Sequence, residues 1–301
     1  MANDHHHHAA GDNGKGVATA FFLNLAFTVV EIIGGFWTGS IAILSDALHD
    51  LGDSLSLGVA WYFQRLSRKG RTPNFTYGYK RFNTLGAIIT GVVLVAGSVL
   101  ILTRAVPALW DPGEPEAEGM IYLAILGVVV NGAAAFRVRK GGDSLNERVI
   151  SWHLLEDVLG WVAVLVGSII MYFYDLPWID PALSIGITLY ILYGVVQQLW
   201  KAGKIIVQAA PEGLDYSDIE QRLKSVAGVT DAHHLHLWTL DGQYHLASAH
   251  LVVEDATSVA DLRELKERAR SVLHEAGVEH ATLEFETEEE WAGHRPDTPD
   301  V

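Results

Sequence analysis

Four ionisable side chains interrupt an apolar stretch of the sequence near residue 50. Asp46, His49, Asp50 and Asp53 lie in residues 41–64, a run otherwise as apolar as a membrane span. On a helix they fall within a stripe about 100° wide, so they project from one side. Charges inside a membrane span are costly, and a functional role is therefore the first expectation.

A later apolar segment repeats part of this pattern. His153 and Asp157 are one helical turn apart, as His49 and Asp53 are. Imidazole nitrogens and carboxylate oxygens from two facing helices can surround one ion tetrahedrally, the geometry that Zn²⁺ prefers, and the lack of Cys disfavours Cu(I) and iron–sulfur centres. The alternative is a set of buried ion pairs or a proton relay without a metal. Geometry alone also leaves Asp46 and Asp50 as candidate ligands.

Composition divides the chain into an apolar part and an acidic part. The 301 residues are 50% hydrophobic with a mean hydropathy of +0.20, too apolar for an ordinary soluble protein. Residues 1–204 contain 14 Lys/Arg and 16 Asp/Glu, whereas residues 205–301 contain 7 and 20. An acidic domain suits cations as partners and excludes nucleic acid, which needs a basic surface.

Six apolar segments are each long enough to cross a bilayer, which takes about 20 residues. Basic residues gather after the second, fourth and sixth segments, whereas the connection at 111–118 is acidic. The positive-inside rule therefore predicts a multi-pass membrane protein with both termini in the cytoplasm. The predicted spans are residues 17–38, 41–64, 82–105, 119–138, 150–174 and 178–199.

After Pro211 the pattern becomes that of a small α+β domain with the order αββαβ. Asp241-Gly242 between two β-rich runs indicates a hairpin, and the element order predicts helices on one face of a three-stranded sheet. The expected helices are residues 216–226 and 258–275, and the expected strands are residues 231–240, 243–254 and 279–286.

Histidines concentrate after Pro211, where eight of the 14 lie. In the last predicted strand, period-two alternation puts four polar side chains on one face and Leu283 and Phe285 on the other. That polar face, together with the histidines of residues 233–236, indicates a cation site. The four polar side chains are His280, Thr282, Glu284 and Glu286.

We therefore expect four parts in the chain. Residues 1–15 form a disordered tail whose His5–His8 run is either a cloning remnant or a loose metal-collecting segment. A six-helix transmembrane domain (16–204), a cytoplasmic metal-binding and dimerisation domain (205–287) and an acidic tail (288–301) follow.

Together these motifs resemble those of the cation diffusion facilitator family, zinc-exporting transporters with six spans and a cytoplasmic αββαβ domain. The resemblance covers nearly all of residues 16–287. It is carried by Leu44-Ser45-Asp46-Ala47-Leu48-His49-Asp50-Leu51-Gly52-Asp53, His153-Leu154-Leu155-Glu156-Asp157, Trp178-Ile179-Asp180-Pro181 and His234-Leu235-His236-Leu237-Trp238-Thr239-Leu240.

The resemblance implies two metal sites. In the membrane it makes Asp46 and Asp50 neighbours of the ligands. The implied ligands of the transported ion are His49, Asp53, His153 and Asp157, and those of a cytoplasmic site are His233, His250, His280 and Glu286.

The chain departs from the family pattern in three places. Residues 71–79 offer no ligands, so the loop site of some members is expected to be missing. Residues 138–144 lack the His-rich loop of organelle members, which favours the plasma (inner) membrane of a prokaryote. Some members lock a homodimer with a basic residue at the position of Arg81 and an Asp before the cytoplasmic domain, but residues 207–211 contain no Asp.

The resulting hypothesis is a homodimeric Zn²⁺/H⁺ antiporter in the lipid bilayer that exports Zn²⁺ by alternating access. It needs no catalytic residues and no cofactor beyond transported and regulatory Zn²⁺. Protons compete with the ion because Zn²⁺ requires neutral imidazole and ionised carboxylate. The alternatives are a carrier of another divalent cation (Cd²⁺, Co²⁺, Mn²⁺, Fe²⁺ or Ni²⁺), an intramembrane metallohydrolase with Glu156 as base, and a membrane-anchored metal sensor.

Overall fold

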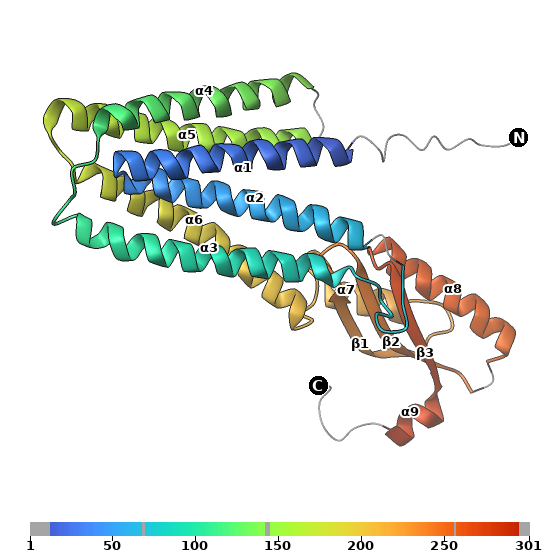
Figure 1. Ribbon diagram of the computed structural model, residues 1–301. Coiled ribbons are helices and arrows are strands. Elements are labelled where there is room, and N and C mark those ends of the chain that lie inside the picture. Colours follow the sequence, from blue (N-terminus) through green and yellow to red (C-terminus); the bar gives the residue numbers. More distant parts are fainter. Residues whose placement is uncertain (1–12, 68–69, 142–144, 256, 295–301) are drawn as a thin grey trace, which may run out of the picture. The chain divides into compact units, whose positions relative to one another are not determined.

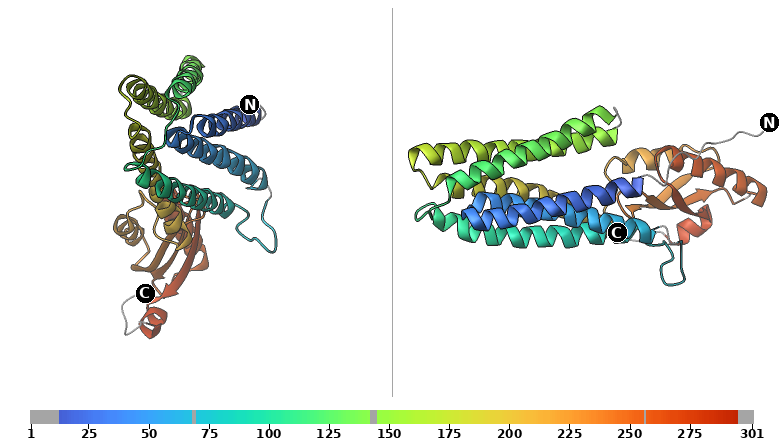
Figure 2. Two further views of the ribbon diagram at one scale, coloured as in Figure 1. Left: turned by 60° about the vertical axis from the view of Figure 1, so that its left-hand side comes forward. Right: turned by 45° about the horizontal axis from the view of Figure 1, so that its top comes forward.

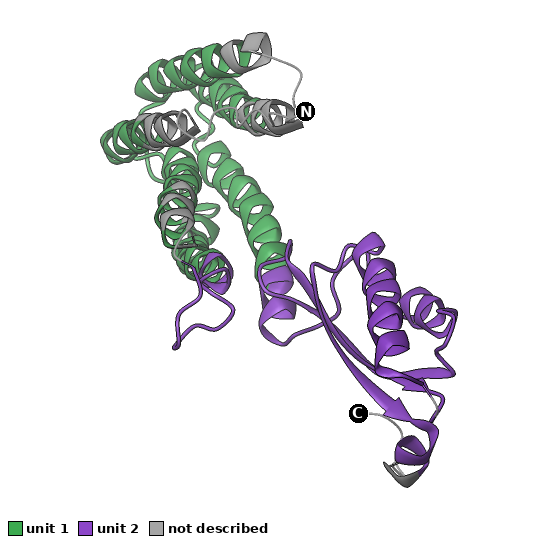
Figure 3. Ribbon diagram, turned by 90° about the vertical axis from the view of Figure 1, so that its right-hand side faces the viewer, with its two compact units in different colours: residues 1–68, 86–199 green, residues 69–85, 200–301 purple. Residues whose placement is uncertain are grey.

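The computed structural model describes residues 13–67, 70–141, 145–255 and 257–294 (Figure 1). The chain divides into two compact units, unit 1 (residues 1–68 and 86–199) and unit 2 (residues 69–85 and 200–301), coloured separately in Figure 3. Most of the predicted N-terminal tail, including His5–His8, lies outside the described residues. Helix α1 begins at Asn13, inside the range predicted as tail.

Six long helices correspond to the six predicted spans. Four described stretches are long and apolar enough to cross a membrane: 81–108, 117–136, 155–174 and 179–206. The apolar stretch Asn24–Thr38 is shorter, and α2 is more polar because it carries three aspartates. The helices are α1 (Asn13–Thr38), α2 (Ile41–Ser67), α3 (Arg81–Ala108), α4 (Ala117–Gly141), α5 (Leu145–Tyr174) and α6 (Ile179–Ile206).

Close packing joins the helices of unit 1. Helices α1, α2, α4 and α5 lie side by side (Figures 1 and 2), with α4 against α5 and α1 against α2. Trp161 of α5 is 1% exposed and fills the space left by Gly127 of α4, where a Cβ atom would overlap the indole ring. Helices α3 and α6 meet through Leu94 and Ile191. Small residues thus allow the approach that helix packing in lipid relies on.

Unit 2 contains the predicted three-stranded sheet. Strands β1 (Asp231–Thr239) and β2 (His245–Val253) form an antiparallel hairpin, as the Asp241-Gly242 turn indicates. Strand β3 (His280–Thr287) pairs in parallel with β2, which gives the order β1-β2-β3. Parallel neighbours need a crossover, and α8 (Val259–Glu275) supplies it.

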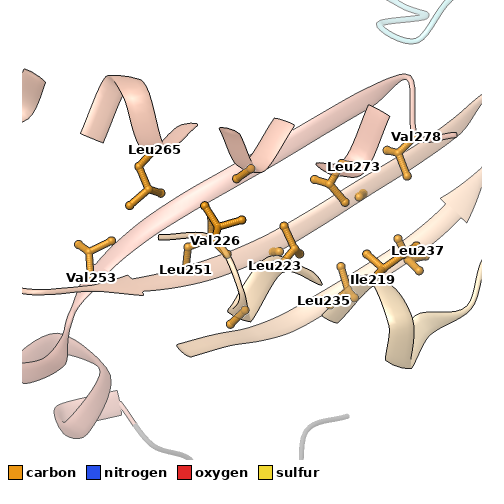
Figure 4. Packing of buried hydrophobic residues seen from close by; sticks show 14 residues of the cluster. Ile219, Leu223, Val226, Leu235, Leu237, Leu251, Val253, Leu265, Leu273 and Val278 are labelled. Atoms are coloured by element: carbon orange, nitrogen blue, oxygen red, sulfur yellow. The ribbon is translucent and has the colours of Figure 1, made fainter. Parts of the chain in front are cut away.

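Both helices of the αββαβ order cover one face of this sheet. Helix α7 (Tyr216–Lys224) contributes Ile219 and Leu223 to the core, and α8 contributes Leu265 and Leu273 from one of its faces (Figure 4). Asp215 and Ser258 cap the N-termini of these helices, and Gly277 at φ +93° follows α8. Leu273 is 0% exposed, so Leu273→Ala is expected to cost about 2–5 kcal/mol of stability.

The predicted acidic tail contains one more helix, α9 (Glu288–His294). Thr287 and Glu290 form a capping box at its start. The Thr287 backbone N–H donates to Glu290 Oε2 at 2.8 Å, and the Glu290 N–H donates to Thr287 Oγ1 at 3.2 Å. The sequence Thr-x-x-Glu carries this signal, but the acidic composition masked it. Residues 295–301 lie outside the described part of the chain.

Candidate metal centres

The centre in unit 1 lies between α2 and α5. His49 Nε2 is 3.8 Å from Asp53 Oδ2 on the same helix and 3.8 Å from Asp157 Oδ1 on α5. Two ligands of a tetrahedral Zn²⁺, each about 2.0–2.2 Å from the ion, are about 3.3–3.6 Å apart. The observed spacing is slightly wider than this. The side chain of His153, one turn before Asp157, lies outside the described part of the structure.

Buried acidic side chains surround this centre. Asp46 and Asp50 are 6% and 4% exposed. A Cβ atom at Gly160 of α5 would lie 3.6 Å from Asp46 Oδ1, so the two helices approach closely beside the candidate ligands. Glu31 of α1 is 1% exposed, and its carboxyl group lies beside that of Asp50. Acidic side chains therefore surround His49 in the interior of unit 1.

Asp180 positions α2 rather than joining the centre. Its carboxylate accepts hydrogen bonds from Ser40 Oγ at 2.5 Å and from the backbone N–H groups of Ile41 and Ala42 at 2.7 and 3.2 Å. A carboxylate is favourable at a helix N-terminus because the free N–H groups and the helix dipole both attract negative charge. The Asp-Pro pair at the start of α6 thus holds the beginning of the helix that carries His49.

The centre in unit 2 lies at one end of the sheet. His233 of β1 is directly opposite His250 of β2, and β3 brings Glu286 beside them. His250 Nδ1 is 2.5 Å from Glu286 Oε1, and His233 Nε2 is 3.4 Å from Glu286 Oε2. One donor atom from each of the three residues lies within 4.8 Å of the others, which fits the donor set of a zinc site. Burial lowers the pKa of His233, which favours the neutral imidazole that a metal needs.

The fourth residue predicted for this centre, His280, does not join it. His280 begins β3 and pairs with Leu246, six residues before Glu286. Six residues of strand span about 20 Å, so one ion cannot contact both side chains. Period-two alternation places both residues on one face of the strand but says nothing about their distance along it.

Sequence reasoning also missed a tryptophan at this centre. Trp291 of α9 stacks on the imidazole of His233, with ring centroids 3.5 Å apart and an interplanar angle of 25°. Together with His234, Glu284 and Glu290, it lines a pocket of about 370 Å³. The capping box was the available signal, because it fixes α9 directly after Glu286.

Two protein-family models together match most of this chain. A model of the cation efflux transmembrane domain matches residues 17–207, and a model of the cytoplasmic domain of cation efflux proteins matches residues 211–288. The cadmium, cobalt and zinc/H⁺-K⁺ antiporter of Bacillus subtilis is 33% identical over 94% of this chain and 92% of its own length.

More distant relatives carry related names. The metal cation efflux system protein CzcD of Cupriavidus metallidurans is 29% identical over 95% of this chain and 90% of its own length. The zinc transporter ZitB of Pectobacterium atrosepticum is 30% identical over 95% and 89%. These relatives are transporters, which removes the metallohydrolase alternative. The chain therefore belongs to the cation efflux, or cation diffusion facilitator, family and is a multi-pass membrane transporter of metal cations.

Proposed function

We propose that this transporter exports Zn²⁺ from the cytoplasm in exchange for protons, by alternating access around a site in unit 1. The proposed ligands are His49, Asp53, His153 and Asp157. In this proposal all six long helices span the membrane within residues 16–204, and both termini lie in the cytoplasm of a prokaryote.

The observation that carries the proposal is the position of the His49 imidazole between carboxylates of two helices. Its Nε2 atom is 3.8 Å from both Asp53 and Asp157. A site divided between α2 and α5 can open when the two helices separate and close when they approach. Such a division suits a carrier, because the ion must be bound on one side of the membrane and released on the other.

Proton exchange follows from the chemistry of these ligands. Zn²⁺ binds neutral imidazole and ionised carboxylate, and protons occupy the same atoms when the metal leaves. Acid on the delivery side would then displace the ion and return protons to the cytoplasm. Asp46, Asp50 and Glu31 are three further carboxyl groups buried near the proposed ligands.

The choice of cargo has a second candidate. The Bacillus subtilis relative is named for cadmium, cobalt and zinc, which favours testing Cd²⁺ and Co²⁺ beside Zn²⁺. We propose Zn²⁺ as the main cargo because two histidines and two aspartates form a compact tetrahedral set.

A homodimer is the proposed assembly, because the cytoplasmic model describes a domain of dimeric cation efflux proteins. Residues 207–211 lack the Asp of the ion pair that locks the dimer of some family members. Arg81 lines a hollow of about 860 Å³ with Gln208 and Ala210, and no described residue lining that hollow is acidic. The dimer would instead rest on the cytoplasmic domain (residues 205–287), with Zn²⁺ at its His233–His250–Glu286 centre reporting internal zinc.

Transport into liposomes tests this function. The purified protein is reconstituted, Zn²⁺ is added outside, and a fluorescent zinc indicator is trapped inside. We expect saturable uptake of Zn²⁺ that exceeds uptake of Cd²⁺ and Co²⁺ measured in the same vesicles. Uptake no faster than in protein-free vesicles for all three metals would contradict the proposal.

A further inference from the structure

His234 occupies an unusual position in β1. The pairing of β1 with β2 runs through His233, shifts register, and resumes at His236. His234 lies in this irregularity with φ +47°, in the left-handed region that few non-glycine residues adopt but that histidine tolerates better than most. Bulges of this kind redirect a side chain. Residues kept in rarely populated backbone conformations occur most often at functional sites.

The effect is to bring a third imidazole beside the other two. The ring centroids of His233, His234 and His250 form a nearly equilateral triangle, with separations of 5.2 Å from His234 to each of the others and 5.3 Å between His233 and His250. In a tetrahedral site, Zn–N bonds of about 2.0–2.1 Å and ring centroids about 1.1 Å beyond the nitrogens put the centroids about 5.2 Å apart. The triangle therefore has the size of a three-histidine zinc site.

The ring of His234 needs only to turn. The donor atoms of His233, His250 and Glu286 already lie within 4.8 Å of one another, whereas His234 is not part of that set. The ring centroid lies nearly on the Cβ–Cγ axis, so rotation about this bond turns a nitrogen inward and leaves the centroid in place. This torsion is broad in histidine, so the rotation meets only a small torsional barrier. The present contacts of the His234 ring would be exchanged for a bond to the metal.

We propose that His234 is the fourth ligand of the cytoplasmic centre, which thereby becomes a closed Zn²⁺ site of three histidines and one glutamate. The inference rests on the proposed regulatory role of this centre and specifies its ligands. Four protein ligands leave no open position, which is typical of zinc that holds a structure rather than zinc that is passed on.

Two neighbouring residues support a closed zinc site of the structural kind. Glu284 Oε2 is 3.5 Å from His250 Nε2, so a carboxylate orients the ring nitrogen opposite the one facing Glu286. Trp291 stacks on His233 and meets His234 edge to face at 6.5 Å, which fixes one ring and borders the other.

The test uses the full-length protein with Asp53→Ala and Asp157→Ala, which remove the transport site. Zinc affinity is measured by competition with a chromophoric chelator. His234→Asn is the informative change, because asparagine also tolerates the left-handed conformation and keeps the strand intact. We expect it to weaken binding at least about tenfold, since even residues that only orient a ligand change affinity about 10–100-fold. The matched controls His280→Asn and His236→Asn should leave the affinity unchanged.

Cobalt supplies a readout of geometry. Tetrahedral Co²⁺ absorbs visible light far more strongly than Co²⁺ with five or six ligands, so the parent should give an intense band that His234→Asn weakens. Equal melting temperatures of the zinc-free proteins would establish that both are folded. Unchanged affinity and absorbance in His234→Asn, with loss in His250→Asn, would overturn the fourth ligand alone. No zinc bound by the parent would overturn the regulatory centre as well.

Discussion

The two candidate metal centres use the same ligand types but hold them differently. In unit 1 the imidazole of His49 is 3.8 Å from each carboxylate, and the residues come from two helices. In unit 2 the contacts are 2.5 and 3.4 Å, and the residues come from hydrogen-bonded strands. Helices can separate as rigid rods, whereas a strand ladder fixes its side chains. The difference suits the two proposed roles, a transport site that opens and closes in every cycle and a regulatory site that binds zinc without such movement.

The strongest way to break this comparison is to remove a carboxylate from unit 1. Asp157→Ala leaves His49 with one carboxylate and should reduce Zn²⁺ uptake into liposomes to the level of empty vesicles. Asp53→Ala should do the same. Asp46→Ala and Asp50→Ala should be milder, because the motif comparison places them outside the ligand set. Normal Zn²⁺ uptake by the Asp157→Ala protein would rule out the proposed transport site. Its elution profile in size-exclusion chromatography verifies that the variant is folded.

Metal selectivity sharpens the comparison, because the selectivity of transport should depend on the centre in unit 1 and not on the centre in unit 2. His49→Asp replaces an imidazole with a shorter carboxylate that binds through one or two oxygens, which loosens the geometry for a larger ion. We expect a higher Cd²⁺ to Zn²⁺ uptake ratio, measured for both metals in the same vesicles. His250→Asp in unit 2 is the control and should leave the ratio unchanged. A wild type that moves both metals equally would show that selectivity is set elsewhere.

Zinc should stabilise unit 2 more than unit 1 if the centre on the strands of unit 2 binds zinc more tightly. At a free zinc concentration 100 times Kd, binding adds about 2.7 kcal/mol to the stability of the folded state. A chelator should therefore make the cytoplasmic domain easier to digest with protease, and zinc should strengthen dimerisation. The His250→Ala protein should respond to neither addition, and protection by zinc in that variant would count against the site.

The smallest expected effect is a pH dependence of the metal-free cytoplasmic domain. Burial lowers the pKa of His233 in the folded state, so the unfolded chain binds this proton more readily. The stability contributed by neutral His233 is complete above its unfolded pKa of about 6.5 and is lost as pH falls toward the lower folded pKa. Chemical unfolding at pH 7.5 and 5.5 measures how much the free energy of unfolding falls between the two pH values. This fall should be smaller in His233→Gln than in the wild type, and an equal fall would contradict the lowered pKa of His233.

The sequence predicted the six long helices and the αββαβ elements but not α9. It also predicted that His49 on α2 lies near Asp157 on α5. The proximity of His49, Asp53 and Asp157 was predictable because helical periodicity and charge in an apolar run are local signals. The position of His280 was not predictable, because alternation along a strand assigns a face but not a partner. His234 and Trp291 also depend on tertiary structure. His234 lies at an irregularity in strand β1. Trp291 lies on α9, a helix in a segment whose acidic composition indicated a tail.

Coupled transport is the most direct test of the central claim. Vesicles carry a zinc indicator in one set and a pH indicator in a matched set, and Zn²⁺ is added outside at several internal pH values. The account predicts faster zinc entry when the interior is acidic, together with alkalinisation of the interior that Asp157→Ala abolishes. Zinc entry that ignores the pH gradient and moves no protons would contradict zinc/proton exchange.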